Sequence, residues 1–392
     1  MKNKINNNIN SAREYILVLT TSVIVSIFSL ILYKIILIEW GARELEEFSI
    51  IKRYQALLIP VLMLGLGVTL PLWLARRLIQ IKTLIKVGVT KIIFMCILLG
   101  ATARSNNIIY MGLLLTGPVL ISNYMYSITR GLVDYARGIY LNVIYLVAMP
   151  IICLVVSKNI TNYIYAYFTL SIVITPIIYR LLLVDIIKKY EKTIIGYGGN
   201  KEYETVIFEG IKRVPGDLVQ QLLMLSPVIF FQNSKQQAAA AYFSLAISLA
   251  IAFVIPLKPI STILLVRLAN VSLKDIRTGK ILIIIFGLSL LIALIYKISL
   301  PLINLFYFNN DEFLSKLHEM IPFLFLYSMY VLLRSYVDAL FKMPLMTYIT
   351  LASSIFALPL LIINKIDPIE YIVAVKFLMV GAMIFFMGKK ID

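Results

Sequence analysis

Charge is scarce in this chain, and most of it is positive. Asp, Glu, Lys and Arg make up only 15% of the 392 residues, against 60% apolar residues, and the mean hydropathy is +0.91. Soluble domains and disordered segments are far more polar, so this composition excludes both. It predicts an all-α polytopic membrane protein, because a helix satisfies its own backbone hydrogen bonds where the hydrocarbon core offers no water.

Cysteine and histidine are almost absent. Cys96 and Cys153 both fall in apolar segments, which excludes a disulfide framework, and His318 is the only histidine. No Cys/His set for a structural metal can be assembled from these residues. The glycine-rich sequence GYGGN, at residues 196–200, has neither the spacing nor the flanking strand of a nucleotide-binding loop. We therefore expect no metal, no cofactor and no enzymatic activity.

Apolar runs of transmembrane length recur along the whole chain. A hydrocarbon core about 30 Å thick is crossed by about 20 helical residues. The sequence contains twelve such runs, at residues 15–38, 54–74, 87–103, 108–128, 139–156, 164–179, 218–231, 238–255, 281–296, 320–333, 343–363 and 368–387. The first run is too long for a signal-peptide core and lacks a cleavage site, so we expect it to remain as the first helix.

The net charge of +17 reflects where the basic residues lie relative to these runs. With the N-terminus placed inside, the inner segments hold 25 Lys and Arg residues and the outer loops hold nine. This asymmetry follows the positive-inside rule and predicts that both termini are cytoplasmic. The charge therefore needs no nucleic-acid partner to explain it. Residues 39–53 form the most acidic outer loop, in which Trp40 and Phe48 are expected to hold a short helix at the membrane interface.

A long polar segment and a short repeat divide the chain into halves. Residues 180–217 carry seven basic residues and separate six runs from six. Arg130 and Asp134, after the fourth run, recur as Arg334 and Asp338 after the tenth. We expect each Arg and Asp to share one face of a helix end, since they are four residues apart.

The predicted organisation follows from this division: a six-helix bundle over residues 1–179, a cytoplasmic linker over residues 180–217, and a second six-helix bundle over residues 218–392. Duplicated halves with a substrate cavity between them are a common plan for secondary transporters.

Prolines and glycines interrupt the second apolar run. The sequence YQALLIPVLMLGLGVTLPLWLARR contains Pro60, Gly65, Gly67 and Pro71. Proline removes a backbone hydrogen bond, and glycine lets the helix bend or a neighbouring helix come close. These four residues are our candidates for a hinge, with ordinary helix packing as the alternative.

Three lysines lie inside apolar runs. Lys376 is near the middle of the last run, where a lysine costs about 2.5 to 3.5 kcal/mol on insertion scales. We expect it to line a wet cavity, with a buried ion pair as the alternative. Lys34 and Lys91 lie nearer the ends of their runs, and Lys34 is close enough to the surface to snorkel.

Further candidates lie at the predicted cytoplasmic ends of the runs or among their apolar residues. The guanidinium group suits phosphate, although such arginines also set topology. Amide side chains within a span suit sugar hydroxyls or another helix. The candidates are Arg130, Arg213 and Arg334 for phosphate, and Asn123, Gln220 and Gln221 for a polar cavity wall. Asp217, at the start of the seventh run, is expected to cap that helix.

Four stretches resemble one known family. Residues 40–77, from WGARELEEF to PLWLARR, are similar to the first loop and second helix of Wzx-type O-antigen and polysaccharide flippases. Residues 209–220, EGIKRVPGDLVQ, resemble the Arg-x-Pro-Gly-Asp sequence that opens helix seven in those proteins. Residues 259–268 are similar to the end of helix eight, and residues 126–137, with their Arg-Gly, are also similar to the family. The chain departs from the family at Val266 and Arg267, where Pro-Arg is usual.

The resemblance implies about twelve helices in two pseudo-symmetric bundles, as in the superfamily that also holds the MATE drug exporters and the lipid II flippase MurJ. It implies a multi-pass protein of the bacterial inner membrane that moves undecaprenyl-diphosphate-linked oligosaccharide to the outer leaflet by alternating access through a cationic cavity. The expected partners are this lipid, the bilayer, H+ or Na+ as a coupling ion, and the polysaccharide polymerase machinery. The chain is expected to work as a monomer.

Three alternatives remain open. A MATE-like exporter of cationic drugs would need carboxylates inside the spans, and these are few. A major-facilitator transporter usually carries Gly and Asp between helices two and three, where this chain reads ARRLIQIKTLIK. An integral-membrane polysaccharide polymerase would need acid and base residues on a sizeable outer loop.

Overall fold

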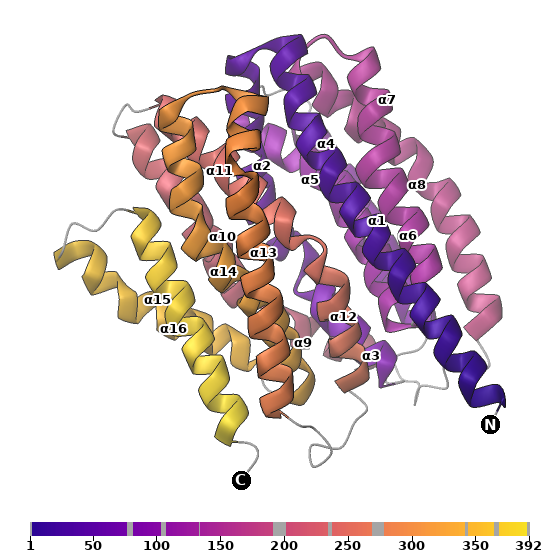
Figure 1. Cartoon of the computed structure of the whole chain (residues 1–392). Coiled ribbons are helices and arrows are strands. Elements are labelled where there is room, and N and C mark those ends of the chain that lie inside the picture. Colours follow the sequence, from indigo (N-terminus) through magenta and orange to yellow (C-terminus); the bar gives the residue numbers. More distant parts are fainter. Residues whose placement is uncertain are drawn as a thin grey trace.

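The computed structural model describes residues 2–76, 81–102, 107–132, 134–190, 201–233, 237–268, 278–341, 344–363 and 368–389. The elements in these ranges are helices and no strand is present among them. Their bounds are α1 Lys2–Trp40, α2 Ala42–Met63, α3 Leu66–Ala75, α4 Ile81–Thr102, α5 Ile108–Gly131, α6 Tyr135–Val143, η1 Ile144–Ala148, α7 Met149–Val156, α8 Ile160–Tyr190, α9 Lys201–Ile211, α10 Val214–Asn233, α11 Gln237–Val254, α12 Leu257–Leu268, α13 Thr278–Tyr307, α14 Asp311–Leu340, α15 Leu345–Ile363 and α16 Pro368–Lys389. The long helices lie side by side, and both chain ends are at the same end of the molecule (Figure 1). We call this the terminal end.

The helices account for the twelve predicted spans. Within the described ranges, eight helices are long and apolar enough to cross a membrane, and α2 with α3 makes a ninth as one broken span. The remaining three predicted runs correspond to α10, α11 and α15. Helix α6, the π-helical turn η1 and α7 follow one another without a gap and form the fifth span. The expected all-α polytopic fold is confirmed.

The second span breaks where the sequence places its glycines. Helices α2 and α3 are bent by 45° at Leu64 and Gly65, both of which have a left-handed backbone, with φ of 49° and 66°. Pro60 and Pro71 lie inside the two helices, so glycine makes the break. The backbone of Gly65 lies against that of Gly210 in α9, and a Cβ on Gly65 would overlap the Gly210 carbonyl.

Residues 39–53 differ from their predicted form. Instead of a short helix at the interface, α2 begins at Ala42 and continues through the whole segment into the span. Phe48 is fully buried, with its ring 5.9 Å from that of Tyr163 in α8, so it packs inside the bundle. Helix α1 ends at Trp40, away from the terminal end (Figure 1).

The predicted linker is largely helical in its described part. Helix α8 extends to Tyr190, α9 packs mainly against α3, and α10 begins at Val214. Residues 191–200 lie outside the described residues. The domain division at residues 180–217 stays a prediction.

The repeated Arg–Asp pair is present as expected in the second copy, and in the first copy the described structure shows Asp134 paired with Arg137. In α14, Arg334 Nε lies 3.3 Å from Asp338 Oδ2. In the first copy α5 ends at Gly131, so Asp134 precedes α6 and pairs with Arg137 at 2.6 Å. Gly131 lies so close to Leu74 and Pro71 of α3 that a side chain would collide there, and this close packing accompanies the early end of α5.

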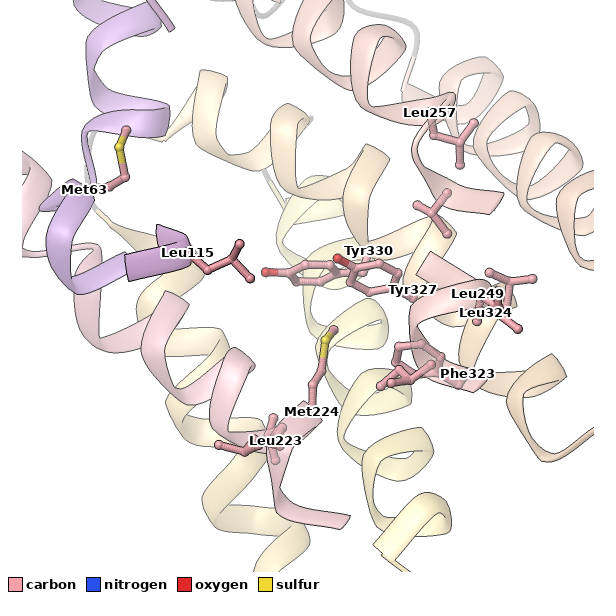
Figure 2. Close-up of a cluster of buried hydrophobic side chains, with 14 of the residues drawn as sticks. Met63, Leu115, Leu223, Met224, Leu249, Leu257, Phe323, Leu324, Tyr327 and Tyr330 are labelled. Atoms are coloured by element: carbon pink, nitrogen blue, oxygen red, sulfur yellow. The ribbon is translucent and has the colours of Figure 1, made fainter. Parts of the chain in front are cut away.

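Helix α14 lies at the centre of the core. It packs against α11, α12, α13 and α16, and its buried side chains meet others from α2, α5 and α10 (Figure 2). The rings of Tyr327 and Tyr330 on α14 stack within this cluster, with centroids 6.1 Å apart. One turn further along α14 lies Arg334, at the border of the cavity described next.

Candidate functional site

A cavity of about 340 Å³ lies among helices of both halves of the chain. Its walls come from the end of α2, the start of α3, the last turns of α5, the first turns of α10 and α12, and the second half of α14. Helices α3 and α12 are near the terminal end in Figure 1, which places the cavity toward that end. The lining residues include seven of the sequence candidates: Pro60, Gly65, Gly67, Asn123, Arg130, Gln221 and Arg334.

The cavity has more positive than negative groups. Its lining contains Arg130, Lys258 and Arg334 as cations and Asp217 as its one carboxylate within the described ranges. The Arg130 guanidinium lies 5.3 Å from the centre of the Tyr126 ring, which also lines the cavity. An excess of two positive charges in a partly enclosed space favours an anionic ligand.

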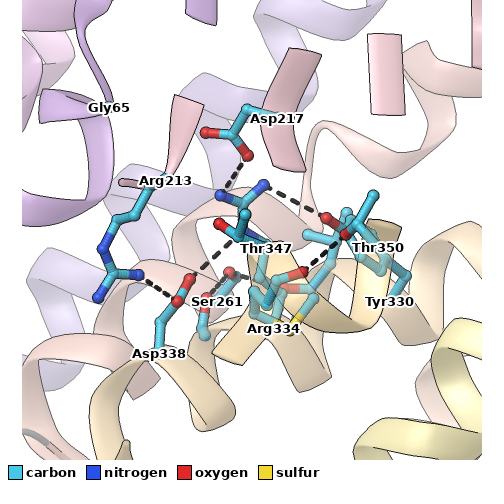
Figure 3. Close-up of polar contacts among 12 residues, drawn as sticks. Gly65, Arg213, Asp217, Ser261, Tyr330, Arg334, Asp338, Thr347 and Thr350 are labelled. Carbon is cyan, nitrogen blue, oxygen red and sulfur yellow. Dashed lines mark hydrogen bonds and ion pairs between the residues drawn. The ribbon is translucent and has the colours of Figure 1, made fainter. Parts of the chain in front are cut away.

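Arg334 stands in a chain of alternating charges (Figure 3). Its Nη2 lies 2.6 Å from Asp217 Oδ1 of α10, and its Nε contacts Asp338. Asp338 in turn pairs with Arg213, and both of these side chains are buried. The prediction that Asp217 caps α10 is wrong, because the helix begins three residues earlier, at Val214, and the Asp217 carboxylate is bound to Arg334.

Lys376 is fully buried and is not among the residues that line the cavity. Its Nζ is 4.1 Å from the ring centre of Tyr330 and 5.4 Å from that of Tyr327. Cation–π contacts of this kind are worth about 2 kcal/mol or more when desolvated. No carboxylate oxygen within the described ranges lies within 4 Å of the ammonium, so the alternative of a buried ion pair is not formed here.

Tyr330 connects Lys376 to the charged chain. Its hydroxyl donates to Gln220 Oε1 and lies 3.3 Å from Arg334 Nη1, while its ring faces the ammonium. Gln220 is therefore occupied within the wall, whereas its neighbour Gln221 reaches the cavity.

The other predicted lysines lie outside the cavity lining. Lys91 is buried, with Nζ 3.2 Å from Met63 Sδ and 4.6 Å from the ring centre of Tyr124. Met63 lines the cavity, so Lys91 lies directly behind its wall. Lys34 is partly exposed on α1, with Nζ 5.1 Å from the ring centre of Phe306.

Two basic residues with a place in this architecture were missed. Lys258 falls between the predicted runs at 238–255 and 281–296, but in the structure it lies in the short helix α12, which starts after a break at Ile255 and Pro256. Arg53 was assigned to an outer loop, but it lies about three turns inside α2, buried, donating from Nη2 to Ser248 of α11. The signal for Arg53 was the absence of any helix-breaking residue between Arg43 and Gln55.

Comparisons with known proteins identify the fold. No protein-family model and no curated protein matches the sequence. Among solved structures, an outward-facing multidrug-resistance MATE family transporter of the MOP superfamily superposes with a TM-score of 0.68 at 15% identity, over 96% of this chain and 95% of that one. An inward-facing transporter of the same description gives 0.56 at 13% identity, over 96% and 97%. A eukaryotic MATE transporter gives 0.56 at 12%, over 97% and 95%. The chain therefore has the fold of the MATE transporters of the MOP superfamily, with its membrane-spanning helices in two bundles.

Proposed function

We propose that this protein is a flippase that moves undecaprenyl-diphosphate-linked oligosaccharide, a repeat unit for O-antigen, capsule or exopolysaccharide, from the cytoplasmic to the outer leaflet. The fold supports a membrane transporter that works by alternating access of two bundles. The single observation that carries the choice of substrate is the cavity lining, in which three cations face one carboxylate. A diphosphate compensates that excess, and arginine binds phosphate with good geometry.

The cavity residues divide by chemistry. Arg130, Lys258 and Arg334 are proposed to bind the diphosphate, while Asn123 and Gln221 hydrogen-bond the sugar nearest to it. The volume of about 340 Å³ falls in the range of small-molecule sites, which suits the headgroup and leaves the polyprenyl chain in lipid.

Lys376 is proposed to act later in the path. It has no carboxylate partner within the described ranges, and a buried charge without a counter-ion costs several kcal/mol unless something else compensates it. The Tyr327 and Tyr330 rings supply part of that compensation. A rearrangement of α14 against α16 would present the ammonium to the diphosphate. The broken span at Gly65 and Gly67, with Pro60 and Pro71 on either side, is the proposed hinge.

The remaining basic candidates lie outside the proposed substrate path. Arg213 holds Asp338 in place, Lys91 lies behind the wall at Met63, and Lys34 remains a candidate at the opposite end. We propose that the terminal end is cytoplasmic, in the bacterial inner membrane. The protein would act as a monomer, in contact with the polymerase machinery.

The energy source is proposed to be the membrane potential, with H+ or Na+ as a possible coupling ion. An anion that leaves a negative cytoplasm gains about 2.3 kcal/mol per charge per 100 mV. Flipping in proteoliposomes should therefore accelerate when the side of origin is made negative, and indifference to an imposed potential would count against this source.

A reconstituted flipping assay tests the function. Proteoliposomes that contain the purified protein should expose a fluorescent polyprenyl-diphosphate oligosaccharide to an external glycosidase, and the variant R130Q/K258Q should lose this activity. Efflux of a cationic dye without lipid flipping would favour the MATE-like cation exporter instead. In cells, deletion should leave complete lipid-linked units inside, whereas loss of a polymerase would release single units outside.

A further inference from the structure

The two ion pairs of the charged chain differ in their access to the cavity. The Arg334 and Asp217 side chains are each 21% exposed and both line the cavity. The Arg213 and Asp338 side chains are 8% and 3% exposed, and neither lines it. One pair is thus open to a ligand, and the other is a fixed part of the wall.

Separating Asp217 from Arg334 changes the net charge of the charged chain. The chain Asp217, Arg334, Asp338 and Arg213 holds two positive and two negative groups. If Asp217 leaves Arg334, the remaining three groups carry one net positive charge, and Arg334 keeps only its Nε contact to Asp338 and its Nη1 contact to Tyr330. The freed group is Nη2 of Arg334, a residue that lines the cavity.

We propose that Asp217 is an exchangeable counter-ion for Arg334. In the empty cavity its carboxylate occupies the guanidinium edge, and a phosphate group of the substrate displaces it. When the substrate leaves, Asp217 pairs with Arg334 again, which favours release. The proposal rests on the proposed function, because it assumes an anionic substrate, and it makes Asp217 a positioning residue that sets affinity and release.

The geometry favours exchange over a static tie. The pair between Asp217 and Arg334 is less deeply buried than the pair between Arg213 and Asp338, so separating its charges costs less. A phosphate carries more negative charge than a carboxylate and offers several acceptor oxygens, so it competes well for the same guanidinium. Tyr330, which contacts Nη1 at 3.3 Å, keeps the guanidinium in place while its partner on Nη2 changes.

The proposal predicts that removing the charge of Asp217 and removing the charge of Arg334 have opposite effects on the affinity for an anion. The probe is inorganic pyrophosphate, titrated calorimetrically at low ionic strength into the full-length protein in detergent micelles. Asp217→Asn should tighten pyrophosphate binding about tenfold, because the competing charge is gone, whereas Arg334→Gln should weaken it about tenfold. Asp217→Glu, which keeps the charge, should stay near wild type. Glu209→Gln is the matched control, since it removes one carboxylate of α9 that pairs with Lys212 and lies outside the cavity lining.

The outcomes separate this proposal from the function on which it rests. A static structural pair predicts that Asp217→Asn and Arg334→Gln both weaken binding, and this result would overturn the exchange while leaving the anionic cavity intact. If Asp217→Asn is too unstable to purify, unchanged affinity in the smaller, uncharged Asp217→Ser variant overturns the exchange in the same way. If wild type binds no pyrophosphate and Asp217→Asn gains none, both the exchange and the proposed substrate class fail.

Discussion

At the scale of the residue, Tyr330 contacts both Arg334, which lines the cavity, and the buried Lys376. Its hydroxyl forms hydrogen bonds with Gln220 and Arg334, and its ring makes a cation–π contact with the ammonium of Lys376. These two roles are separable by substitution, because phenylalanine keeps the ring and loses only the hydroxyl.

Tyr330→Phe should retain the contact with Lys376 and cost about 1 kcal/mol of stability for the lost hydrogen bonds. Tyr330→Leu should cost more, because it also removes the ring that compensates the buried charge. Melting temperatures of the two variants in detergent measure the difference. Equal melting temperatures would contradict the cation–π role of the ring.

Lys376→Gln should abolish export with normal membrane insertion, and Lys376→Arg should retain part of it, since the charge is the feature required. Lys297→Gln on α13 is the control, because it removes an exposed lysine outside the cavity lining. Cell-surface polysaccharide and membrane protein level report the two quantities. Wild-type export by Lys376→Gln would refute a role for the ammonium in transport.

At the scale of the element, the broken span α2–α3 depends on one glycine more than on its neighbour. A side chain on Gly65 would meet the Gly210 carbonyl and would have to adopt a left-handed backbone. At Gly67 the nearest atom to an added Cβ is Met63 Cε, at 3.9 Å, which is an ordinary contact. The two positions are a matched pair of the same chemical change.

Gly65→Ala should therefore destabilise the protein by a few kcal/mol, from the left-handed backbone, which costs about 1 to 2 kcal/mol, together with the displaced α9. Gly67→Ala should be neutral or slightly stabilising, because alanine is the better helix former. Thermal unfolding in detergent tests this, with Gly210→Ala expected to resemble Gly65→Ala. If Gly65→Ala and Gly67→Ala were equally stable, the contact between residue 65 and α9 would not limit the stability of the break.

The elements also show what could be predicted from the sequence. The apolar runs predicted the spans, because the length of a transmembrane helix is set by the bilayer, and the glycines predicted the position of the break. The residues that were misplaced, Arg53, Asp134, Asp217 and Lys258, all lie near helix ends or where a helix continues past an expected boundary. Such boundaries depend partly on contacts with other helices, such as that of Gly131 with α3, which leave no local signal. Only for Arg53 does the local sequence carry one, since no helix-breaking residue lies between Arg43 and Gln55.

The cavity residues, too, could be predicted only in part from the sequence. Of the nine charged and amide candidates, four line the cavity and five do not. Those in the lining are Asn123, Arg130, Gln221 and Arg334. Their grouping could not be predicted, because it depends on the packing of α2, α5, α10, α12 and α14 around one space.

At the scale of the whole molecule, polar contacts join helices across the seam between the predicted halves. Tyr307 of α13 donates to the Leu30 carbonyl of α1 at 2.5 Å, and Arg53 of α2 donates to Ser248 of α11. Nearer the terminal end, Arg76 donates to the Ala339 carbonyl at 3.0 Å. Alternating access requires that contacts of this kind break in turn.

Cysteines introduced at Leu30 and Tyr307, in a background with Cys96 and Cys153 replaced by serine, should be joined by a short bifunctional thiol reagent. The joined protein should lose flipping in proteoliposomes, because α1 and α13 can no longer separate. A pair at Ser354 and Tyr371, which join α15 to α16 within one half, is the control and should leave flipping intact. Full activity of the joined α1–α13 protein would rule out opening along this seam.

The break that sends α3 toward the terminal end also leaves the molecule with one indole near each end. Trp40 closes α1 on one side, and Trp73 lies in α3 on the other. The chain has only these two tryptophans. Replacing either by phenylalanine therefore yields a protein whose tryptophan emission, excited selectively over that of tyrosine, reports on one end alone, so that the order in which the two ends open could be followed without an attached dye.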